Sequence, residues 1–365
     1  MSSRREFLGS TATLGGLAFV GCDLLDARHA HAQPRRRETV VAGKRARVID
    51  VHAHCAVPEA MGLMGIKFGG PSVRPDLSMT SALSERIAAM DAQGIDMEVL
   101  SINPYWYKAE RDLAEKIIQI QNEKLAEACA ANPDRFLAFA SVALQHPDLA
   151  ARQLEEGVKK YNLRGASIGG SVDGLELSDP KLHPFWAKAE QLGVLVFIHP
   201  QVTGATQDLA GRLKGNGYLE NIVAFPLETT IALSHLVFEG TLDRFPGLKI
   251  CAAHGGGYLP SYAHRSDRGC VALPERCPGG AHGPLKKKPT DYLKQMYYDT
   301  MVFSPEAVRH LAAEVGASQL MIGTDYPFPW TKTAVEEVMA TPGLTDAQKV
   351  AILGGTAAKL LGING

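Results

Sequence analysis

The sequence of 365 residues lacks several features that indicate particular classes of protein. It has only six cysteines, and five remain without Cys22; an odd number argues against a framework of disulfides. The formal net charge is −1, so neither nucleic acid nor a charged membrane surface is expected as a partner. No apolar run is long enough to predict a membrane span with confidence, and no repeat of fixed period is present.

The N-terminal region has the pattern of a targeting segment. Arg4 and Arg5 form a twin-arginine element, a mild apolar run follows over residues 11–20, and residues 30–32 (Ala-His-Ala) match a small-x-small cleavage site. We therefore expect export through the Tat machinery to the periplasm. The alternative is a lipoprotein anchored at Cys22, whose surroundings loosely resemble a lipoprotein cleavage site.

The domain boundaries follow from this segment. We expect residues 1–32 to be the signal peptide, residues 33–45 a solvated linker and residues 46–365 one folded domain. With 45% hydrophobic and 21% charged residues, the chain has the composition of an ordinary globular protein. No Pro- or Ser-rich break divides it after Arg45.

Short apolar runs alternate with helical patterns throughout the expected domain. The candidate strands are residues 48–52, 97–102, 136–142, 165–168, 194–199, 248–253, 296–299 and 320–324. The candidate helices include residues 84–93, 112–131, 148–160, 184–192, 227–239 and 304–315, with a final helix pair over 346–361 interrupted at Gly354 and Gly355. Eight strands with helices between them predict an α/β fold of the (β/α)8 TIM-barrel type. A doubly wound sheet is the alternative, but no Gly-x-Gly-x-x-Gly follows the first strand.

Polar residues stand where several of these strands end. His52 and His54 close the first strand, and residues i and i+2 of a strand share a face. His199, His254 and Asp325 follow the fifth, sixth and eighth strands. A barrel gathers the carboxyl ends of its strands at one face, and histidines with one carboxylate are typical ligands of a catalytic metal. The sequence therefore predicts a metal site at this face.

These residues lie in runs that resemble the amidohydrolase superfamily, in particular its branch with aminocarboxymuconate-semialdehyde decarboxylase and related aromatic-acid decarboxylases. The runs are residues 50–54 (DVHAH), 225–230 (FPLETT), 245–250 (FPGLKI), 253–257 (AHGGG) and 322–329 (IGTDYPFP). The resemblance covers nearly the whole mature chain. It implies a metal-dependent barrel enzyme with one divalent cation, zinc in the first place and manganese as the alternative.

The resemblance also assigns roles to single residues. It implies that His52, His54, His199 and Asp325 bind the metal, and that His254 transfers a proton. It further implies that Arg265 and Arg74 bind the carboxylate of the substrate, with Arg265 reaching the neighbouring subunit of a homodimer; an ordinary surface position is the alternative for either arginine. The end of the fourth strand, residues 167–171, offers no side chain to bridge two cations, which independently favours a single metal.

The chemistry remains open between three hypotheses. The first is a carboxy-lyase that removes carbon dioxide from a small aromatic or dienic acid, with Asp325 and His254 as the catalytic residues. The second is hydrolysis of a lactone, amide or similar carbonyl, since residues 201–224 lack the tryptophans that the decarboxylase carries there. The third is a periplasmic binder of a metal or ligand without catalysis.

A pair of cysteines and a run of aromatic residues are two further features of the sequence. Cys270 and Cys277 flank a loop that contains proline and are a candidate disulfide after export. The aromatic run over residues 104–107 (PYWY) follows the second strand and either walls a pocket or packs in the core.

Overall fold

The computed structural model describes residues 36–67, 75–78, 83–201, 209, 211–277 and 285–363. The expected Tat signal over residues 1–32 lies outside the described residues, and so does Arg74. The chain from Arg36 to Gly365 forms one compact unit, which is the subject of the following description.

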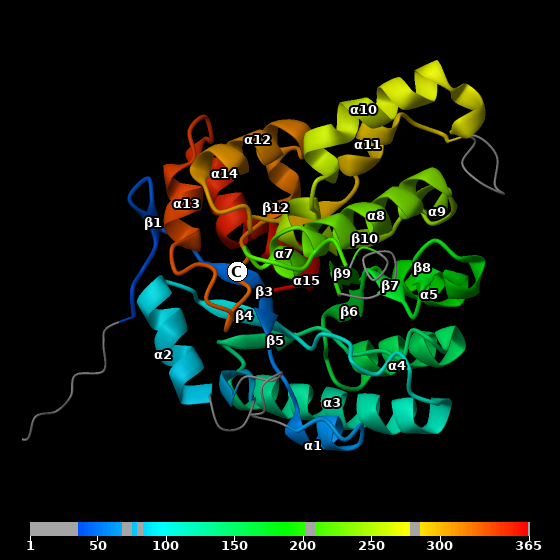
Figure 1. Cartoon of the computed structure of the whole chain (residues 1–365). Coiled ribbons are helices and arrows are strands. Elements are labelled where there is room, and N and C mark those ends of the chain that lie inside the picture. The colour runs from blue at the N-terminus through cyan, green and yellow to red at the C-terminus, as the bar shows by residue number, and fades with distance from the viewer. Residues whose placement is uncertain are drawn as a thin grey trace, which may run out of the picture. The chain divides into compact units, whose positions relative to one another are not determined.

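Eight parallel strands lie at the centre of this unit, with helices around them (Figure 1). In chain order they are β3 (Ile49–His54), β4 (Met97–Ser101), β5 (Phe136–Ala138), β6 (Gly165–Gly169), β9 (Leu195–His199), β10 (Lys249–Ala252), β11 (Tyr297–Asp299) and β12 (Leu320–Met321). Strands β3 to β5 pair with one another, and β6 and β9 to β12 form a second run. The backbone N–H of Ala140 donates to the carbonyl of Gly165, and that of Val51 to Ile322, so both seams are closed. The predicted (β/α)8 barrel is confirmed, and every predicted strand is present.

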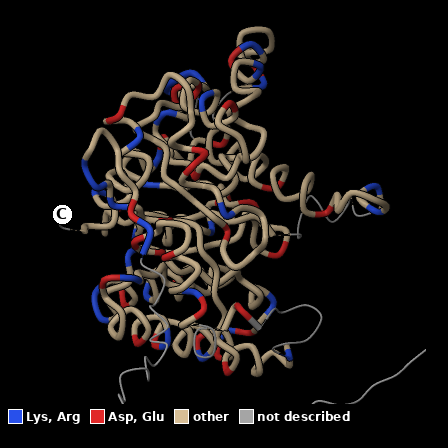
Figure 2. The backbone as a smooth tube through the Cα atoms, turned by 90° about the vertical axis from the view of Figure 1, so that its left-hand side faces the viewer, with Lys and Arg blue, Asp and Glu red and all other residues tan. Residues whose placement is uncertain are grey.

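Helices cover the outside of the barrel. The longer ones are α2 (Leu83–Gln93), α3 (Arg111–Ala131), α4 (Pro147–Lys159), α5 (His183–Leu192), α8 (Ala224–Phe238), α10 (Leu259–Ala272) and α12 (Pro305–Val315). Short helices are α1 (Pro58–Gly62), α7 (Leu219–Ile222), α9 (Thr241–Arg244), α11 (Pro289–Leu293) and α13 (Ala334–Ala340), and β7 (Ser171–Val172) pairs with β8 (Leu175–Glu176). Basic and acidic residues are interspersed along the backbone in Figure 2, and their numbers in the sequence, 38 and 39, are nearly equal.

The strands are buried on both faces. Val51 and Phe197 belong to an apolar cluster inside the barrel, whereas Val196 and Ile198 pack outward in the cluster shared with the helices. Helix α8 belongs to the outer cluster through Ala232 and its neighbours. The stretch Leu219–Phe238 is long and apolar enough to cross a membrane by length and composition alone. In the structure the buried residues of α8 pack against the outside of the barrel.

The expected linker over residues 33–45 is wrong in its second half. Strands β1 (Val40–Val41) and β2 (Lys44–Arg45) form an antiparallel hairpin. Ala42 and Gly43, both with positive φ, make the turn, and Arg45 donates to Asp96 over 2.8 Å. The folded unit therefore begins before Arg45, because the hairpin is tied to the amino-terminal end of the barrel.

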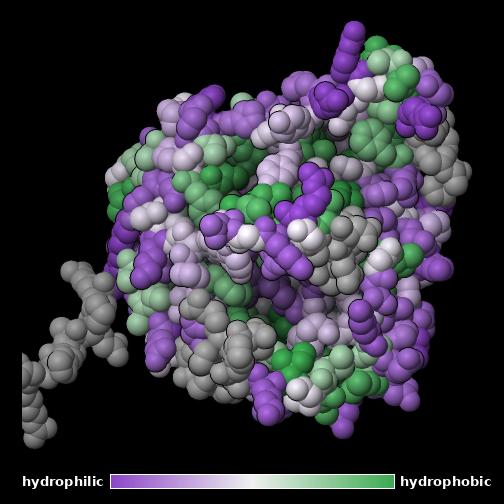
Figure 3. All heavy atoms as spheres, in the orientation of Figure 1, coloured by the Kyte–Doolittle hydropathy of each residue, from purple (hydrophilic) through white to green (hydrophobic). Residues whose placement is uncertain are grey.

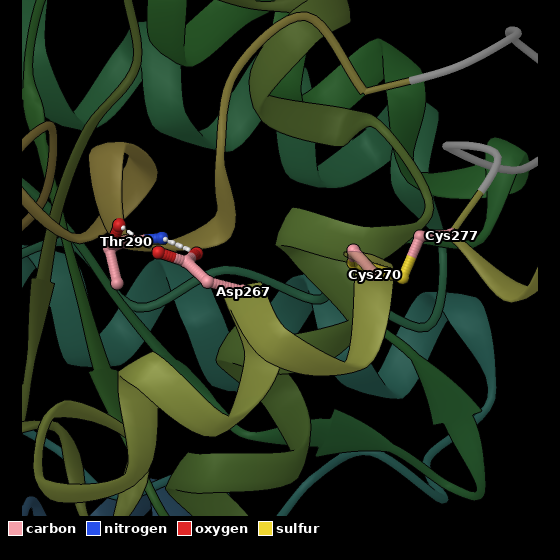
Figure 4. Close-up of a disulfide and its surroundings, with 4 residues drawn as sticks. All are labelled: Asp267, Cys270, Cys277 and Thr290. Atoms are coloured by element: carbon pink, nitrogen blue, oxygen red, sulfur yellow. Dashed lines mark hydrogen bonds between the residues drawn. A yellow bond between two sulfur atoms is a disulfide. The ribbon is translucent and has the colours of Figure 1, made fainter. Parts of the chain in front are cut away.

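A disulfide between Cys270 and Cys277 closes the end of α10, as expected for this pair. Helices α10 and α11 extend away from the strands at this end (Figure 1). Asp267, one turn before the disulfide, accepts hydrogen bonds from the backbone N–H and hydroxyl of Thr290 at the start of α11 (Figure 4). The disulfide ties the last turn of α10 to Cys277, which follows the short helical turn Pro274–Arg276. Helix α10 is joined to α11 by the partly buried contact between Asp267 and Thr290.

The C-terminal helix pair is continuous rather than interrupted. Helices α14 (Asp346–Val350) and α15 (Thr356–Leu361) are joined by a π-helical turn, Ala351–Gly355. A side chain on Gly354 would lie 2.3 Å from the carbonyl oxygen of Arg47, whereas one on Gly355 would meet nothing closer than 3.4 Å. Gly354 therefore lets this helix approach the start of β3, and it does not break the helix.

We predict that Gly354→Ala destabilises the protein by about 1–3 kcal/mol, since the added methyl group overpacks a backbone contact. The matched variant Gly355→Ala has helical φ and ψ and open space, so it should be neutral or stabilising by about 0.5–1 kcal/mol. Denaturant unfolding of both variants tests this pair. Equal losses of stability would contradict the close approach.

Candidate metal centre

Four buried side chains meet at the carboxyl end of the barrel. They are His52 and His54 of β3, His199 of β9 and Asp325, which follows β12; one ligand atom from each lies within 4.8 Å of the others. These are the four ligands that the sequence predicts. Strands β3 and β12 become neighbours only when the barrel closes, and β9 stands elsewhere in the wall, so the meeting of these side chains depends on the fold.

A register shift in β3 turns both of its histidines toward this point. Ile49 and Val51 already face the barrel interior, and strict alternation would turn His52 outward. The pairing of β3 with β4 shifts between Asp50 and Ala53, and the His52 ring lies 5.0 Å from Phe197 of the interior cluster. An irregularity of this kind re-aims side chains at a strand end.

The distances between the polar atoms fit one shared cation. His52 Nε2 lies 2.9 Å from His54 Nε2, and Asp325 Oδ1 lies 3.1 and 2.8 Å from these two nitrogens. Ligands with metal bonds of about 2.0–2.2 Å stand about 3 Å apart around one ion. Both ring nitrogens of His199 are buried without a hydrogen-bond partner among the described residues, as expected of a ligand. The residues present therefore fit a single divalent cation.

Asp299 at the end of β11 holds His52 in the orientation that a ligand needs. Its Oδ2 lies 2.6 Å from His52 Nδ1, so Nδ1 carries the proton and Nε2 keeps its lone pair. Ser101 Oγ lies 3.1 Å from His54 Nδ1 and does the same for that ring. The sequence reasoning missed Asp299, although it ends the seventh apolar run at the face where the other polar residues gather.

Asp50 joins the first and last strands beneath the cluster. It accepts hydrogen bonds from the backbone N–H groups of His52 and Thr324, and from the hydroxyl of Thr324. Burial and the nearby Glu98 raise its pKa to about 8. Asp50 stands in the DVHAH run, but nothing in the sequence distinguishes its supporting position from that of a ligand.

The electrostatics of the cluster are dominated by burial and by Asp325. Burial lowers the pKa of His54 to about 4 and that of His199 well below its ordinary value. For His52 burial acts in the same direction, but Asp325 and Asp299 outweigh it and raise the pKa to about 10. Despite its own burial, the charge of His52 keeps the pKa of Asp325 well below its usual range.

His254 lies beside the four ligands and outside their set. Its ring centroid is 5.2 Å from those of His52 and His199, and its Nε2 is 3.8 Å from Asp325 Oδ2. The backbone N–H of His254, which has a φ of 54°, donates to Asp299. Asp299 therefore positions one ligand and the neighbouring free histidine together.

A cavity of about 360 Å³ opens beside His254 and Asp325. Most of its other lining residues are apolar or aromatic, among them Phe225, Phe303 and Trp330. The ring of Trp330 stacks on Tyr218 at 16° between ring planes. Figure 3 shows hydrophobic atoms gathered around the middle of the face seen in Figure 1, between hydrophilic ones. The cavity suits a small flat molecule with one polar end.

The aromatic run after β4 packs in the core and does not line this cavity. The indole N–H of Trp106 donates to the carbonyl of Val142, and Trp106 is fully buried. The hydroxyl of Tyr107 accepts from the backbone N–H of Gly169, and that of Tyr105 accepts from Gln121. Of the two readings of this run, the structure favours packing.

Arg265 lies on α10, exposed to solvent, and does not line the cavity within one chain. Its position agrees with a role at a neighbouring subunit as well as with an ordinary surface arginine. Arg74 lies outside the described residues.

Comparisons with known proteins point to one family. A family model described as amidohydrolase matches residues 49–363. A 2-amino-3-carboxymuconate-6-semialdehyde decarboxylase of Dictyostelium discoideum is 31% identical, over 76% of this chain and 76% of its own length. A gamma-resorcylate decarboxylase of Rhodococcus jostii is 33% identical, over 69% of this chain and 79% of its own length. The solved structure of a dihydroxybenzoic acid decarboxylase from Polaromonas, with bound manganese and the inhibitor 2-nitroresorcinol, is 28% identical, with a TM-score of 0.74 over 88% of this chain and 98% of that one.

We predict that Asp299→Asn weakens the affinity for a divalent metal by about 10–100-fold, because the hydrogen bond that orients His52 is weakened. Titration of the metal-free protein against a chromophoric chelator measures this. Asp267→Asn, which changes a carboxylate at the α10–α11 contact, is the control and should bind metal as the wild type does. Unchanged affinity in Asp299→Asn would remove this supporting role.

Proposed function

Since this chain belongs to the amidohydrolase family, we propose that it is a metal-dependent carboxy-lyase that removes carbon dioxide from a small aromatic or dienic carboxylic acid. The observation that carries the proposal is the buried His52–His54–His199–Asp325 cluster with the unliganded His254 beside it, at the mouth of an aromatic cavity. The relatives described above are all named as decarboxylases, which supports this reaction over the hydrolysis and simple binding left open by the sequence.

His52, His54, His199 and Asp325 would hold one divalent cation. When bound, such a cation supplies a Lewis acid that polarises an oxygen of the substrate. The manganese in the Polaromonas relative supports manganese, and three imidazoles with one carboxylate suit zinc equally. Both cations are therefore candidates for this site.

The remaining residues bind the substrate and move the proton. The flat apolar walls around Phe225, Phe303 and Trp330 would hold the ring and keep water from it. His254 would exchange a proton at Nε2, the ring nitrogen nearest to Asp325, as carbon dioxide leaves and the ring or diene carbon is protonated. Imidazole is the side chain best suited to take up and return a proton near neutral pH. Arg74 and Arg265 are proposed to bind the substrate carboxylate.

The proposal is tested with metal-loaded protein and a panel of substituted hydroxybenzoates and carboxymuconates. We expect release of carbon dioxide from at least one member, and a loss of turnover of about 10²–10⁴-fold in His254→Ala with the metal retained. The matched control is His264→Ala, an exposed histidine on α10. Cleavage of lactones or amides without carbon dioxide, or full turnover in His254→Ala, would contradict the proposal.

We propose that the active protein is a homodimer. Tyr262 and Val271 of α10, the helix of Arg265, and Tyr258 directly before it are exposed large hydrophobic residues that a partner copy would cover. Arg265 would bind the substrate of the partner copy from this helix. This role also explains why it stands away from the cavity of its own chain.

Gel filtration and kinetics of Arg265→Ala test the dimer. We expect a dimer in the wild type and a higher KM in the variant, by about 10–100-fold, from loss of a charged contact to the carboxylate. Arg268→Ala, one turn further along α10, is the control. A fully active monomer would exclude the role in the partner's site.

We propose further that the chain is exported through Tat to the periplasm, a compartment in which its disulfide can form. The twin arginines Arg4 and Arg5 support this route. The pairing of Cys270 with Cys277 is typical of a compartment that allows disulfides.

A further inference from the structure

We infer that Arg86 is a positioning residue for the metal centre, holding the two chain segments that carry His54 and Asp325 in register. Arg86 belongs to α2, on the outside of the barrel, and its side chain is 1% exposed. It is absent from the ligand cluster and from the lining of the cavity. Its effect on the site is therefore indirect.

The guanidinium of Arg86 makes three contacts behind the site. One terminal nitrogen donates to Glu98 Oε2 over 2.8 Å, and the other donates to the backbone carbonyl oxygen of His54. The central carbon of the group lies over the ring of Tyr326, 4.7 Å from the ring centroid. Each contact reaches a different segment: β4, the end of β3 and the loop after β12.

Two of these contacts bear on ligand residues, one on the backbone of His54 itself and the other on the residue next to Asp325. Tyr326 directly follows Asp325, whose φ of 59° is uncommon for a residue other than glycine. The backbone N–H of His54 donates to the carbonyl of Tyr326 over 2.7 Å, so the two segments are also bonded to each other. Arg86 thus fixes the backbone of His54 and the ring of Tyr326 from one side. A shift of either segment would move a ligand atom of the cluster.

The chemistry of this position requires arginine. A buried cation is costly unless it is paired, and Glu98, itself 1% exposed, supplies the opposite charge. The planar fork of a guanidinium donates to two acceptors at once and lies flat on an aromatic ring. A lysine ammonium in the same space keeps the charge but cannot make this set of contacts in one geometry.

Arg135 offers a matched control at the opposite end of the barrel. It stands directly before β5, donates to the backbone carbonyl of Asp96 over 3.0 Å and pairs with Asp91 over 2.8 Å. It therefore combines a carbonyl acceptor with a carboxylate, as Arg86 does, without contacting the segments of the metal ligands. Arg135→Met therefore shows how far the loss of a partly buried, paired arginine by itself changes stability and metal affinity.

The experiment compares Arg86→Met, Arg86→Lys and Arg135→Met as whole, metal-free proteins titrated with Mn²⁺ against a chelator, well below their unfolding temperatures. We expect Arg86→Met to bind Mn²⁺ about 10–100-fold more weakly, the range seen when residues that support metal ligands are changed. Arg86→Lys should recover part of this loss, and Arg135→Met should bind as the wild type does. The paramagnetic resonance spectrum of the bound Mn²⁺ should change in the Arg86 variants alone.

The inference is overturned if the Arg86 variants bind Mn²⁺ with the affinity and spectrum of Arg135→Met. If Arg86→Met does not fold, Arg86→Lys decides the question by the same comparison. The inference rests on the metal binding of the proposed function, but no readout depends on decarboxylation. A wild type that binds no divalent metal would overturn both, whereas a change confined to the Arg86 variants leaves the proposed function to its own test.

Discussion

The seam between the first and the last strand is the constraint on which the site depends. Asp50 on β3 accepts hydrogen bonds from Thr324, 274 residues later in the chain, and the backbone N–H of Asp325 donates to the carbonyl of His52. These bonds are buried, where an unpaired polar group costs most, so the seam closes in one register. That register places Asp325 against His52 and His54.

Buried polar residues from several strands and from α2 surround the ligands and hold them in place. Asp299 orients His52 and holds the backbone of His254, Ser101 orients His54, and Arg86 braces the outer side of β3 and the loop after β12. Burying the four polar ligand side chains costs free energy that their own contacts with apolar residues do not offset. The supporting residues satisfy their remaining donors and acceptors, and this allows a dry, rigid site beside an apolar cavity.

The fold and the ligand set were accessible from the sequence because they rest on local patterns. Eight apolar runs with helical stretches between them predict a barrel, and a barrel brings strand ends such as those of His199 and Asp325 to one face. The supporting residues were less accessible. Asp299 and Arg86 are ordinary charged residues in strand and helix patterns, and only their burial and partners distinguish them. Gly354 was misread as a helix breaker because the close approach of Arg47 is a tertiary contact.

The sequence by itself determined the order of strands and helices and the residue types at the strand ends, which indicate a site for one divalent metal. Tertiary structure alone decided the register shift that turns His52 inward, the placement of His254 beside rather than within the ligand set, and the apolar cavity next to it. The physical reason is that hydrophobic periodicity is a property of neighbouring residues. Ligand geometry is set instead by contacts between segments far apart in the chain, which form only when the barrel closes.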